Sequence, residues 1–282
     1  MKKIVILTLI VSQAISLSLF SQTMTMKIDS IVSAYTNIQE FNGSVLVAKK
    51  GEILLSKGYG YADQATKRLN TETTIFGIAS VTKTFTSAMV LKLVEKKQLS
   101  LNDKLSKFYP GYRFGNIISI GQLLSHTSGI DDRAIAESKE KFDRTALSRE
   151  QILLEELNRS ELSSKPGTVF NYSNRGYYLL GNIISMITKM SYEQAIRKYI
   201  FTPFGLKNSG FDFAGLKEVD RARGYWAEKG KDYSKETPLM DSAGTYAAGA
   251  IYSNVLDLYK WHNILQNYKF ISKETLESAY YP

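Results

Sequence analysis

A serine and a lysine three positions apart are the first residues that could carry out chemistry together. They are Ser80 and Lys83, at the start of the apolar segment 80–95, where the β-rich run 74–76 gives way to it. On a helix, residues three apart share a face, so the lysine amine would reach the serine hydroxyl. A helix start also favours developing negative charge, because its first backbone N–H groups are unpaired. The pair therefore predicts a serine nucleophile with a lysine that takes or relays its proton.

Two alternatives stay open for this pair. Ser80 would also serve as an ordinary helix cap, with Lys83 as a solvated helix residue. A second Ser-x-x-Lys stands at Ser138 and Lys141, in the polar stretch 131–149 that we expect to be an exposed loop. Such a loop offers no desolvation for a reactive lysine, which favours Ser80 over Ser138.

Tyr172 and Asn174 form the second candidate pair. They follow the turn Pro166-Gly167, which could hold a phenol and an amide rigidly opposite another element. The same Tyr-x-Asn spacing occurs at Tyr35 and Tyr252, where neighbouring helical patterns favour a packing role. The turn therefore distinguishes Tyr172 from the other two tyrosines.

Several other kinds of site are excluded by inspection. The sequence lacks the G-x-S-x-G of α/β-hydrolases and the G-x-x-x-x-G-K-[ST] of nucleotide-binding loops. It contains no cysteine, which excludes disulfides and thiolate catalysis, and its two histidines are a poor basis for a metal site. His126 in the turn 125–129 and His262 beside Trp261 fit structural roles better than that of a catalytic base. We expect no metal and no cofactor.

The composition is that of an ordinary globular protein. The 282 residues allow two lobes or one large α/β domain, and 44% are hydrophobic and 22% charged. Thirty-six Lys and Arg against 27 Asp and Glu give a net charge of +9, but the basic residues are scattered. This argues against a nucleic-acid surface. We expect a small-molecule or peptide substrate and no nucleic-acid partner.

The N-terminus has the pattern of a secretory signal peptide. Residues 1–22 begin with Lys2-Lys3, continue with an apolar stretch, and end with Ser21-Gln22. An uncleaved anchor is the alternative, but the apolar run is short and interrupted for a span of about 20 residues. After residue 23 no stretch is apolar enough to cross a bilayer, so we expect no stable membrane span after cleavage. We therefore expect a secreted or periplasmic domain over residues 23–282.

The hydrophobic spacing predicts a mainly helical chain with strands near its N-terminus. A hairpin is expected from the runs 44–48 and 53–57, with a turn at Gly51. The segment 80–95 is apolar nearly all round, which is typical of a buried helix. Further helices are predicted at 26–40, 120–125, 149–158, 174–188, 192–199, 254–266 and 273–279. Strands followed by helices, without βαβ alternation, indicate an α+β fold.

Together these segments resemble the serine β-lactamase and penicillin-binding protein superfamily. The resemblance is to the branch that holds class C β-lactamases, D-alanyl-D-alanine carboxypeptidases and related esterases. It runs from Phe41 to about Pro282 and rests on the Tyr172 segment and the blocks 43–47, 58–63, 76–83, 123–129, 203–206 and 248–253. It implies a β-lactamase/transpeptidase-like fold, a helical lobe packed with an antiparallel sheet.

The resemblance also implies roles for the candidate residues. Ser80 is then the acylated nucleophile, Lys83 its partner, Tyr172 the general base and Asn174 a ligand of the substrate amide. The backbone N–H of Ser80 would supply one oxyanion donor. The implied substrates are cell-wall peptides, β-lactams or esters.

One family motif does not occur in this sequence. The late-strand K-T-G or H-x-G, which in the family supplies a second oxyanion donor and binds the substrate carboxylate, is absent up to Pro282. We therefore expect a domain incomplete at its C-terminus, with only the N-terminal hairpin of the sheet present and its edge unpaired. We also expect residues 1–282 alone to show little or no hydrolysis. The alternative function is a non-catalytic module that binds peptidoglycan or penicillin.

Overall fold

The computed structural model describes residues 24–132, 149–226, 235–239 and 242–280. The expected signal peptide, most of the expected loop 131–149 and the second Ser-x-x-Lys at Ser138 lie outside the described residues. The chain divides into two compact units. The first comprises residues 1–76, 215–239 and 253–260, and the second comprises residues 77–214, 240–252 and 261–282.

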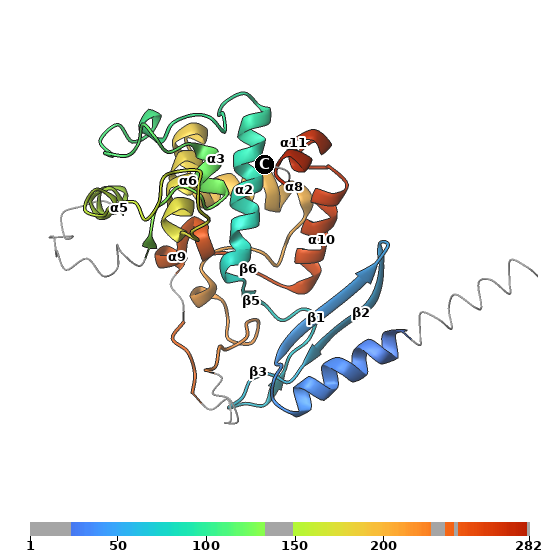
Figure 1. The fold of residues 1–282 in the computed structure, drawn as a ribbon. Coiled ribbons are helices and arrows are strands. Elements are labelled where there is room, and N and C mark those ends of the chain that lie inside the picture. The colour runs from blue at the N-terminus through green and yellow to red at the C-terminus, as the bar shows by residue number, and fades with distance from the viewer. Residues whose placement is uncertain (1–23, 133–148, 227–234, 240–241, 281–282) are drawn as a thin grey trace, which may run out of the picture. The chain divides into compact units, whose positions relative to one another are not determined.

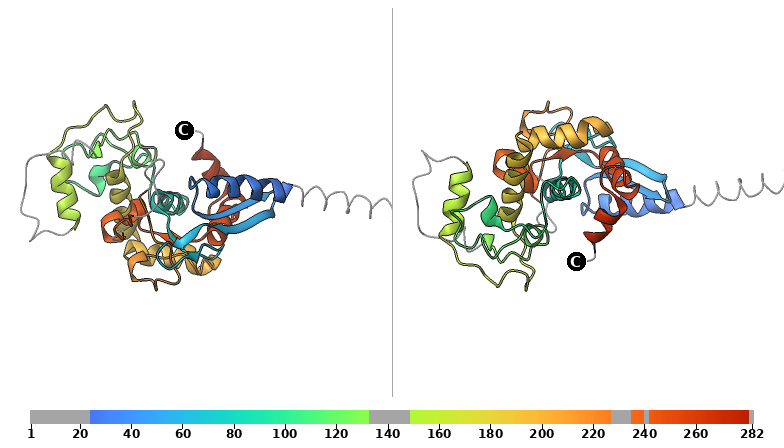
Figure 2. Two further views of the ribbon diagram at one scale, coloured as in Figure 1. Left: turned by 90° about the horizontal axis from the view of Figure 1, so that it is seen from below. Right: turned by 90° about the horizontal axis from the view of Figure 1, so that it is seen from above.

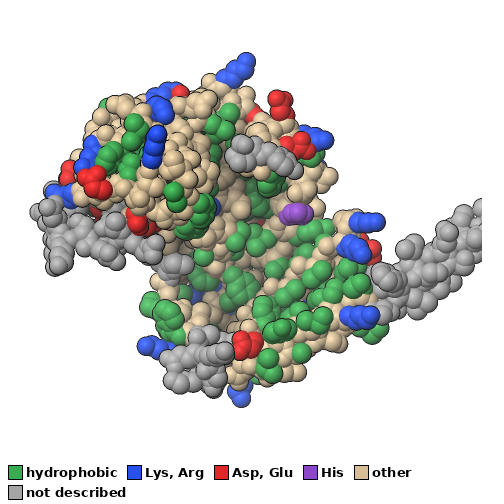
Figure 3. Space-filling model, viewed as in Figure 1, with side chains coloured by type: hydrophobic (Ala, Val, Ile, Leu, Met, Phe, Trp, Pro, Cys, Tyr) green, Lys and Arg blue, Asp and Glu red, His purple; other side chains and the backbone are tan. Residues whose placement is uncertain are grey.

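The predicted β-hairpin forms the sheet of the first unit (Figure 1). Strands β1 (Gly43–Lys49) and β2 (Glu52–Tyr59) pair antiparallel through Lys50 and Gly51, whose φ angles of 53° and 85° make the turn. Among the described residues, β1 and β2 pair only with each other. Hydrophobic side chains lie in rows over these strands in Figure 3, and Ile53 is 45% exposed. The hairpin thus leaves part of its apolar surface uncovered.

The predicted N-terminal helix is also present, at residues 24–37, and it lies along the hairpin. Its Asp29 carboxylate accepts hydrogen bonds from Lys57 Nζ (2.8 Å) and Tyr59 Oη (2.7 Å) on strand β2. These two hydrogen bonds, the one from Lys57 first, lower the pKa of Asp29. Polar contacts therefore fix this helix against the strand.

Two short strand pairs add to the hairpin. They are β3 (Tyr61–Asp63) with β4 (Arg68–Leu69), and β5 (Phe76–Gly77) with β6 (Tyr252–Ser253). The expectation of a single hairpin was therefore incomplete, because strands of two or three residues are too short to show an alternating pattern. Small antiparallel sheets combined with helices confirm the predicted α+β class.

The second unit is mainly helical. Its helices are α2 (Thr82–Glu95), α3 (Ile120–Leu124), α5 (Arg149–Asn158), α6 (Asn174–Thr188), α7 (Tyr192–Ile196), α8 (Thr202–Phe204), α9 (Ser242–Gly249), α11 (Lys273–Ser278) and the end of α10 (Val255–Gln266). A π-helical segment, Arg197–Phe201, joins α7 to α8. Short 3-10 turns lie at Ala79–Val81 and Leu105–Lys107 in this unit, and another covers Phe213–Gly215. All the helices predicted in this unit are confirmed, and among the helices named above α8 and α9 were not expected.

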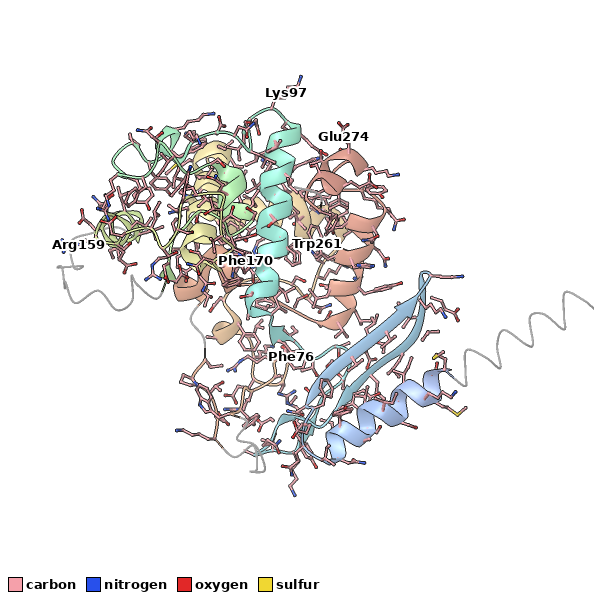
Figure 4. The ribbon with its side chains drawn as sticks, viewed as in Figure 1. Phe76, Lys97, Arg159, Phe170, Trp261 and Glu274 are labelled. Carbon is pink, nitrogen blue, oxygen red and sulfur yellow. The ribbon has the colours of Figure 1, made fainter. Side chains whose placement is uncertain are left out.

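Helix α2 forms the centre of the second unit, where Figure 2 shows it end-on among other helices. The apolar residues on all its sides predicted burial, and Phe85 and Val90 are 0% exposed. Phe85 stacks on Trp261 with ring centroids 4.5 Å apart, and Phe201 meets Phe85 edge-on at 5.7 Å. Figure 4 shows Trp261 between α10 and α2. None of the described helices is long and apolar enough to cross a bilayer.

Truncating this aromatic cluster is expected to destabilise the protein strongly. Phe85→Ala removes a fully buried ring and leaves a cavity beside Trp261, so the free energy of unfolding should fall by about 3–5 kcal/mol. Ile117→Ala is the control, because Ile117 in the same unit is 50% exposed. Denaturant titration of both variants measures the effect. Equal losses would show that α2 is not the centre of the core.

Candidate active site

Ser80 lies in a tight turn at the entrance to helix α2. The 3-10 turn Ala79–Val81 leads into α2, and Ser80 itself is exposed. Ala79, the residue before it, has a φ of 44°, in the left-handed region that residues with a side chain rarely adopt. Strain of this kind is held in place only where surrounding structure demands it. Neither helix start carries a side-chain cap, so the capping alternative for Ser80 is wrong.

Lys83 is buried one turn further along α2. It is only 6% exposed, so the alternative of a solvated helix residue is also wrong. Its ammonium donates hydrogen bonds to Ser80 Oγ (3.2 Å), Asn174 Oδ1 (2.9 Å) and the Ala248 carbonyl (2.8 Å). Three acceptors fit the three N–H groups of an ammonium, which satisfies a charge that would otherwise be costly to bury.

Tyr172 reaches the same hydroxyl from the segment before helix α6. Its Oη donates a hydrogen bond to Ser80 Oγ at 2.8 Å. Lys83 Nζ lies 4.8 Å from the centre of the Tyr172 ring, a cation–π distance. The turn at Gly167 is anchored by its N–H, which donates to the Thr127 carbonyl at 2.7 Å. The turn noted in the sequence therefore does hold this segment against a second element.

Asn174 is the first residue of α6, and its side chain also belongs to this cluster. Ser173 caps the helix by accepting a hydrogen bond from the Gly176 N–H at 3.1 Å. This places Asn174 on the first turn, where its Oδ1 accepts from Lys83. The structure thus brings together all four residues that the sequence singled out. All four belong to the second unit.

Helix α9 supplies a contact that the sequence did not indicate. Tyr246 interrupts this helix with a φ of 39° and a ψ of −136°. The next two carbonyls then point at α2: Ala247 accepts from Thr86 Oγ1 (2.7 Å) and Ala248 accepts from Lys83 Nζ (2.8 Å). The type of a residue does not indicate whether its backbone carbonyl accepts such a hydrogen bond. The block 248–253 was part of the resemblance, but nothing in it indicated this role.

Close packing allows α9 to approach. A Cβ at Gly181 of α6 would lie 2.4 Å from the Ala247 Cβ and 2.8 Å from the Tyr246 ring. Only glycine fits there, because real Cβ atoms do not come this close to other heavy atoms. The contact between α6 and α9 therefore depends on Gly181. The position of the Ala248 carbonyl depends on that contact.

His126 lies against the Tyr172 ring, closer to the cluster than a purely structural role predicted. The two rings stack at 4.4 Å with an interplanar angle of 28°, and Nδ1 of His126 accepts from the Ser173 N–H at 3.1 Å. Burial, followed by the charge of Lys83, lowers the pKa of His126. The other histidine, His262, is an exposed residue of α10.

The cluster has the elements of nucleophilic catalysis. An exposed hydroxyl lies within hydrogen-bonding distance of a buried amine and of a phenol, which together can take a proton from it and return it to a leaving group. The described residues contain no group of His, Asp and Glu side chains that could hold a metal ion.

The model of the Beta-lactamase family matches residues 28–280. The candidate penicillin-binding protein PbpX of Bacillus subtilis is 31% identical over 251 residues, which cover 89% of this chain and 61% of PbpX. The octameric penicillin-binding protein homologue from Pyrococcus abyssi is 32% identical with a TM-score of 0.73, over 89% of this chain and 58% of that one. The D-amino acid amidase of Ochrobactrum anthropi SV3 is 24% identical and shares the fold, with a TM-score of 0.72 over 89% of this chain and 74% of its own.

These matches confirm the predicted β-lactamase/transpeptidase-like fold. The chain spans about three fifths of the length of PbpX. The family match, in contrast, covers nearly all of the described residues, including the four of the cluster. The chain therefore belongs to the beta-lactamase family, the serine hydrolases and penicillin-binding proteins.

Proposed function

We propose that the chain is a serine hydrolase that forms an acyl-enzyme on Ser80. The observation that carries this proposal is the placement of Lys83 Nζ at 3.2 Å and Tyr172 Oη at 2.8 Å from one exposed hydroxyl oxygen. A hydroxyl needs a neighbouring base to become a nucleophile at neutral pH. The Tyr172–Lys83 pair meets that requirement when it carries one proton fewer than phenol plus ammonium, as a phenolate beside the ammonium.

The reaction proceeds in two steps. With Tyr172 as a phenolate beside the Lys83 ammonium, Ser80 Oγ attacks the carbonyl carbon while its proton passes to the Tyr172 oxygen, and the same proton then goes to the leaving amine or alcohol. The carbonyl–leaving-group bond breaks and an ester to Ser80 remains. Water attacks that ester, gives its proton to the same pair, and the acid leaves as Ser80 recovers its hydrogen. The backbone N–H of Ser80 serves as one donor to the oxyanion.

The substrate class we propose is that of cell-wall peptides, β-lactams or esters. Relatives named as penicillin-binding proteins support a carbonyl substrate of this kind. The Asn174 Oδ1 atom already accepts a hydrogen bond from Lys83 Nζ. The Asn174 amide nitrogen is then the group that donates to a substrate amide carbonyl. We also place the chain in the branch related to class C β-lactamases, on the Tyr172–Asn174 motif.

We further propose that the protein acts outside the cytoplasm. The basic and apolar pattern of residues 1–22 supports export through a cleaved signal peptide. Substrates of the bacterial cell wall lie in the same place. Recovery of the protein from the medium or periplasm tests the export, and N-terminal sequencing of that protein tests the cleavage. A recovered chain that retains Lys2 and Lys3 would contradict the cleavage.

Intact-mass spectrometry tests the hydrolase proposal directly. The chain is incubated with benzylpenicillin, with a p-nitrophenyl ester and with a peptide ending in D-Ala-D-Ala. We expect an added mass equal to one acyl group per chain with at least one of them. Saturable binding to a penicillin or peptidoglycan column, without added mass from any compound, would support the non-catalytic binding module instead.

A further inference from the structure

Two side chains from outside helix α6 hold the segment 173–175 by its hydrogen-bond donors. The Ser173 N–H donates to His126 Nδ1 (3.1 Å), and Ser173 Oγ donates to Asp132 Oδ1 (2.7 Å). The N–H groups of the next two residues donate to the same carboxylate at 2.6 Å and 3.4 Å. A carboxylate suits this place, because the first N–H groups of a helix are unpaired and carry partial positive charge.

His126 contacts the chain on both sides of Tyr172. Its carbonyl accepts from the Asn171 N–H at 2.7 Å, and its Nδ1 accepts from the Ser173 N–H. Between these two hydrogen bonds, the imidazole stacks on the phenol ring at 4.4 Å. The tyrosine is therefore held by its backbone neighbours and by one face of its ring. Its hydroxyl is left to point at Ser80.

We propose that His126 and Asp132 are positioning residues for the acylation of Ser80: together they hold the Tyr172 hydroxyl and the Asn174 side chain in place. This inference rests on the function proposed above and extends it. Neither residue contacts Ser80, so each acts through the segment between Tyr172 and Arg175. The Arg175 guanidinium donates a hydrogen bond to Glu156 Oε2 on α5 at 3.2 Å. This contact holds the C-terminal end of the same segment.

The role of His126 requires an unprotonated Nδ1. The groups that face the ring are Lys83 from α2, Tyr172 and Tyr177 from the α6 side, and Asp132. Burial and then the charge of Lys83 lower its pKa from 6.5, and Asp132 opposes them. The neutral ring thus contributes stability that is fully present above pH 6.5 and is lost as the pH falls through the lowered pKa. Acid removes the acceptor and adds a cation near Lys83.

Two replacements of His126 separate the ring from the acceptor. His126→Phe keeps an aromatic ring on Tyr172 but loses the acceptor for the Ser173 N–H. His126→Asn places an amide oxygen near the position of Nδ1 and does not titrate. With fluorescent penicillin as the probe, we expect the rate of Ser80 labelling in His126→Phe to fall by about 10²-fold at pH 7.5. His262→Asn is the matched control, because the chain has two histidines and His262 is exposed.

The pH profile separates positioning from a purely structural role. The labelling rate of the unmodified chain should fall as the pH drops through the lowered pKa of His126, and His126→Asn should lack that fall. Labelling that falls equally in both would overturn the role of His126. Independently of activity, nitrogen-15 NMR should show the proton of neutral His126 on Nε2. A proton on Nδ1 would overturn the proposal even if the enzyme is active.

Asp132→Asn tests the second half of the pair. It keeps the size of the side chain but replaces one acceptor oxygen of the carboxylate with a donor. We expect the labelling rate at saturating probe to fall about tenfold or more, with the half-saturating concentration changed less than about twofold. Asp220→Asn, at an exposed aspartate of the first unit, is the control. If Asp132→Asn does not fold, His126→Phe carries the test alone.

The outcomes distinguish this inference from the function on which it rests. Absence of both an adduct and any hydrolysis of the probes by the unmodified chain would overturn the proposed function, and the positioning role with it. Labelling of the unmodified chain, with unchanged rates in folded His126→Phe and Asp132→Asn, would overturn the positioning role alone. Slower labelling in both variants with intact controls supports it.

Discussion

Replacing Ser80 with alanine is expected to abolish covalent labelling of the chain by β-lactams and activated esters. The hydroxyl oxygen is the atom that forms the acyl bond, so its loss should cost at least about 10⁴-fold in the labelling rate. Ser80 is exposed and caps no helix, but its loss removes one of the three acceptors of the buried Lys83 ammonium, so the free energy of unfolding should fall by about 1 kcal/mol. Intact-mass spectrometry and thermal unfolding of the same sample give both values.

Ser138→Ala is the matched control for this experiment. Ser138 begins the other Ser-x-x-Lys of the sequence and lies outside the described residues. We expect this variant to label at the rate of the unmodified chain. Labelling that survives in Ser80→Ala and disappears in Ser138→Ala would transfer the nucleophile to the other motif.

The second large effect is expected for Tyr172→Phe. This change removes only the hydroxyl that lies 2.8 Å from Ser80 Oγ and keeps the ring stacked on His126. A proton acceptor in such a position contributes typically 10²–10⁴-fold, and we expect a loss of about that size in the labelling rate. Stopped-flow measurement with a chromogenic cephalosporin or a fluorescent penicillin gives the rate.

Tyr35→Phe is the control for the tyrosine. Tyr35 also begins a Tyr-x-Asn tripeptide, but it lies on helix 24–37 of the first unit and is 55% exposed. Its rate should match that of the unmodified chain. If both tyrosine variants label at the original rate, Tyr172 is not the proton acceptor, and Lys83 alone would have to fill that role.

The long elements of the fold could be predicted because their side chains repeat with the helical period. Helix α6 (Asn174–Thr188) and helix α5 (Arg149–Asn158) have the predicted bounds, and the hairpin was placed within two residues at each end. Helix α9 (Ser242–Gly249) was missed. Its sequence, SAGTYAAG, contains small residues and two glycines, and Tyr246 interrupts it, so no periodic apolar face marks it.

The candidate site was predictable to the extent that its chemistry lies in side chains. Ser80, Lys83, Tyr172 and Asn174 stand at spacings that point to a function, and the structure brings them together. The Ala248 carbonyl could not be found in this way, because every residue has one. Asp132 falls in a stretch that the sequence indicated only as a loop, and its contacts depend on tertiary folding.

Peptide mapping after brief acylation tests the central claim most directly. Trypsin releases residues 69–83 as one peptide, since no Lys or Arg lies between Arg68 and Lys83. After short exposure to benzylpenicillin, we expect the penicilloyl mass on this peptide, with fragmentation placing it on Ser80. The same mass on residues 134–139, which hold Ser138, or no stable mass on any peptide, would contradict the account.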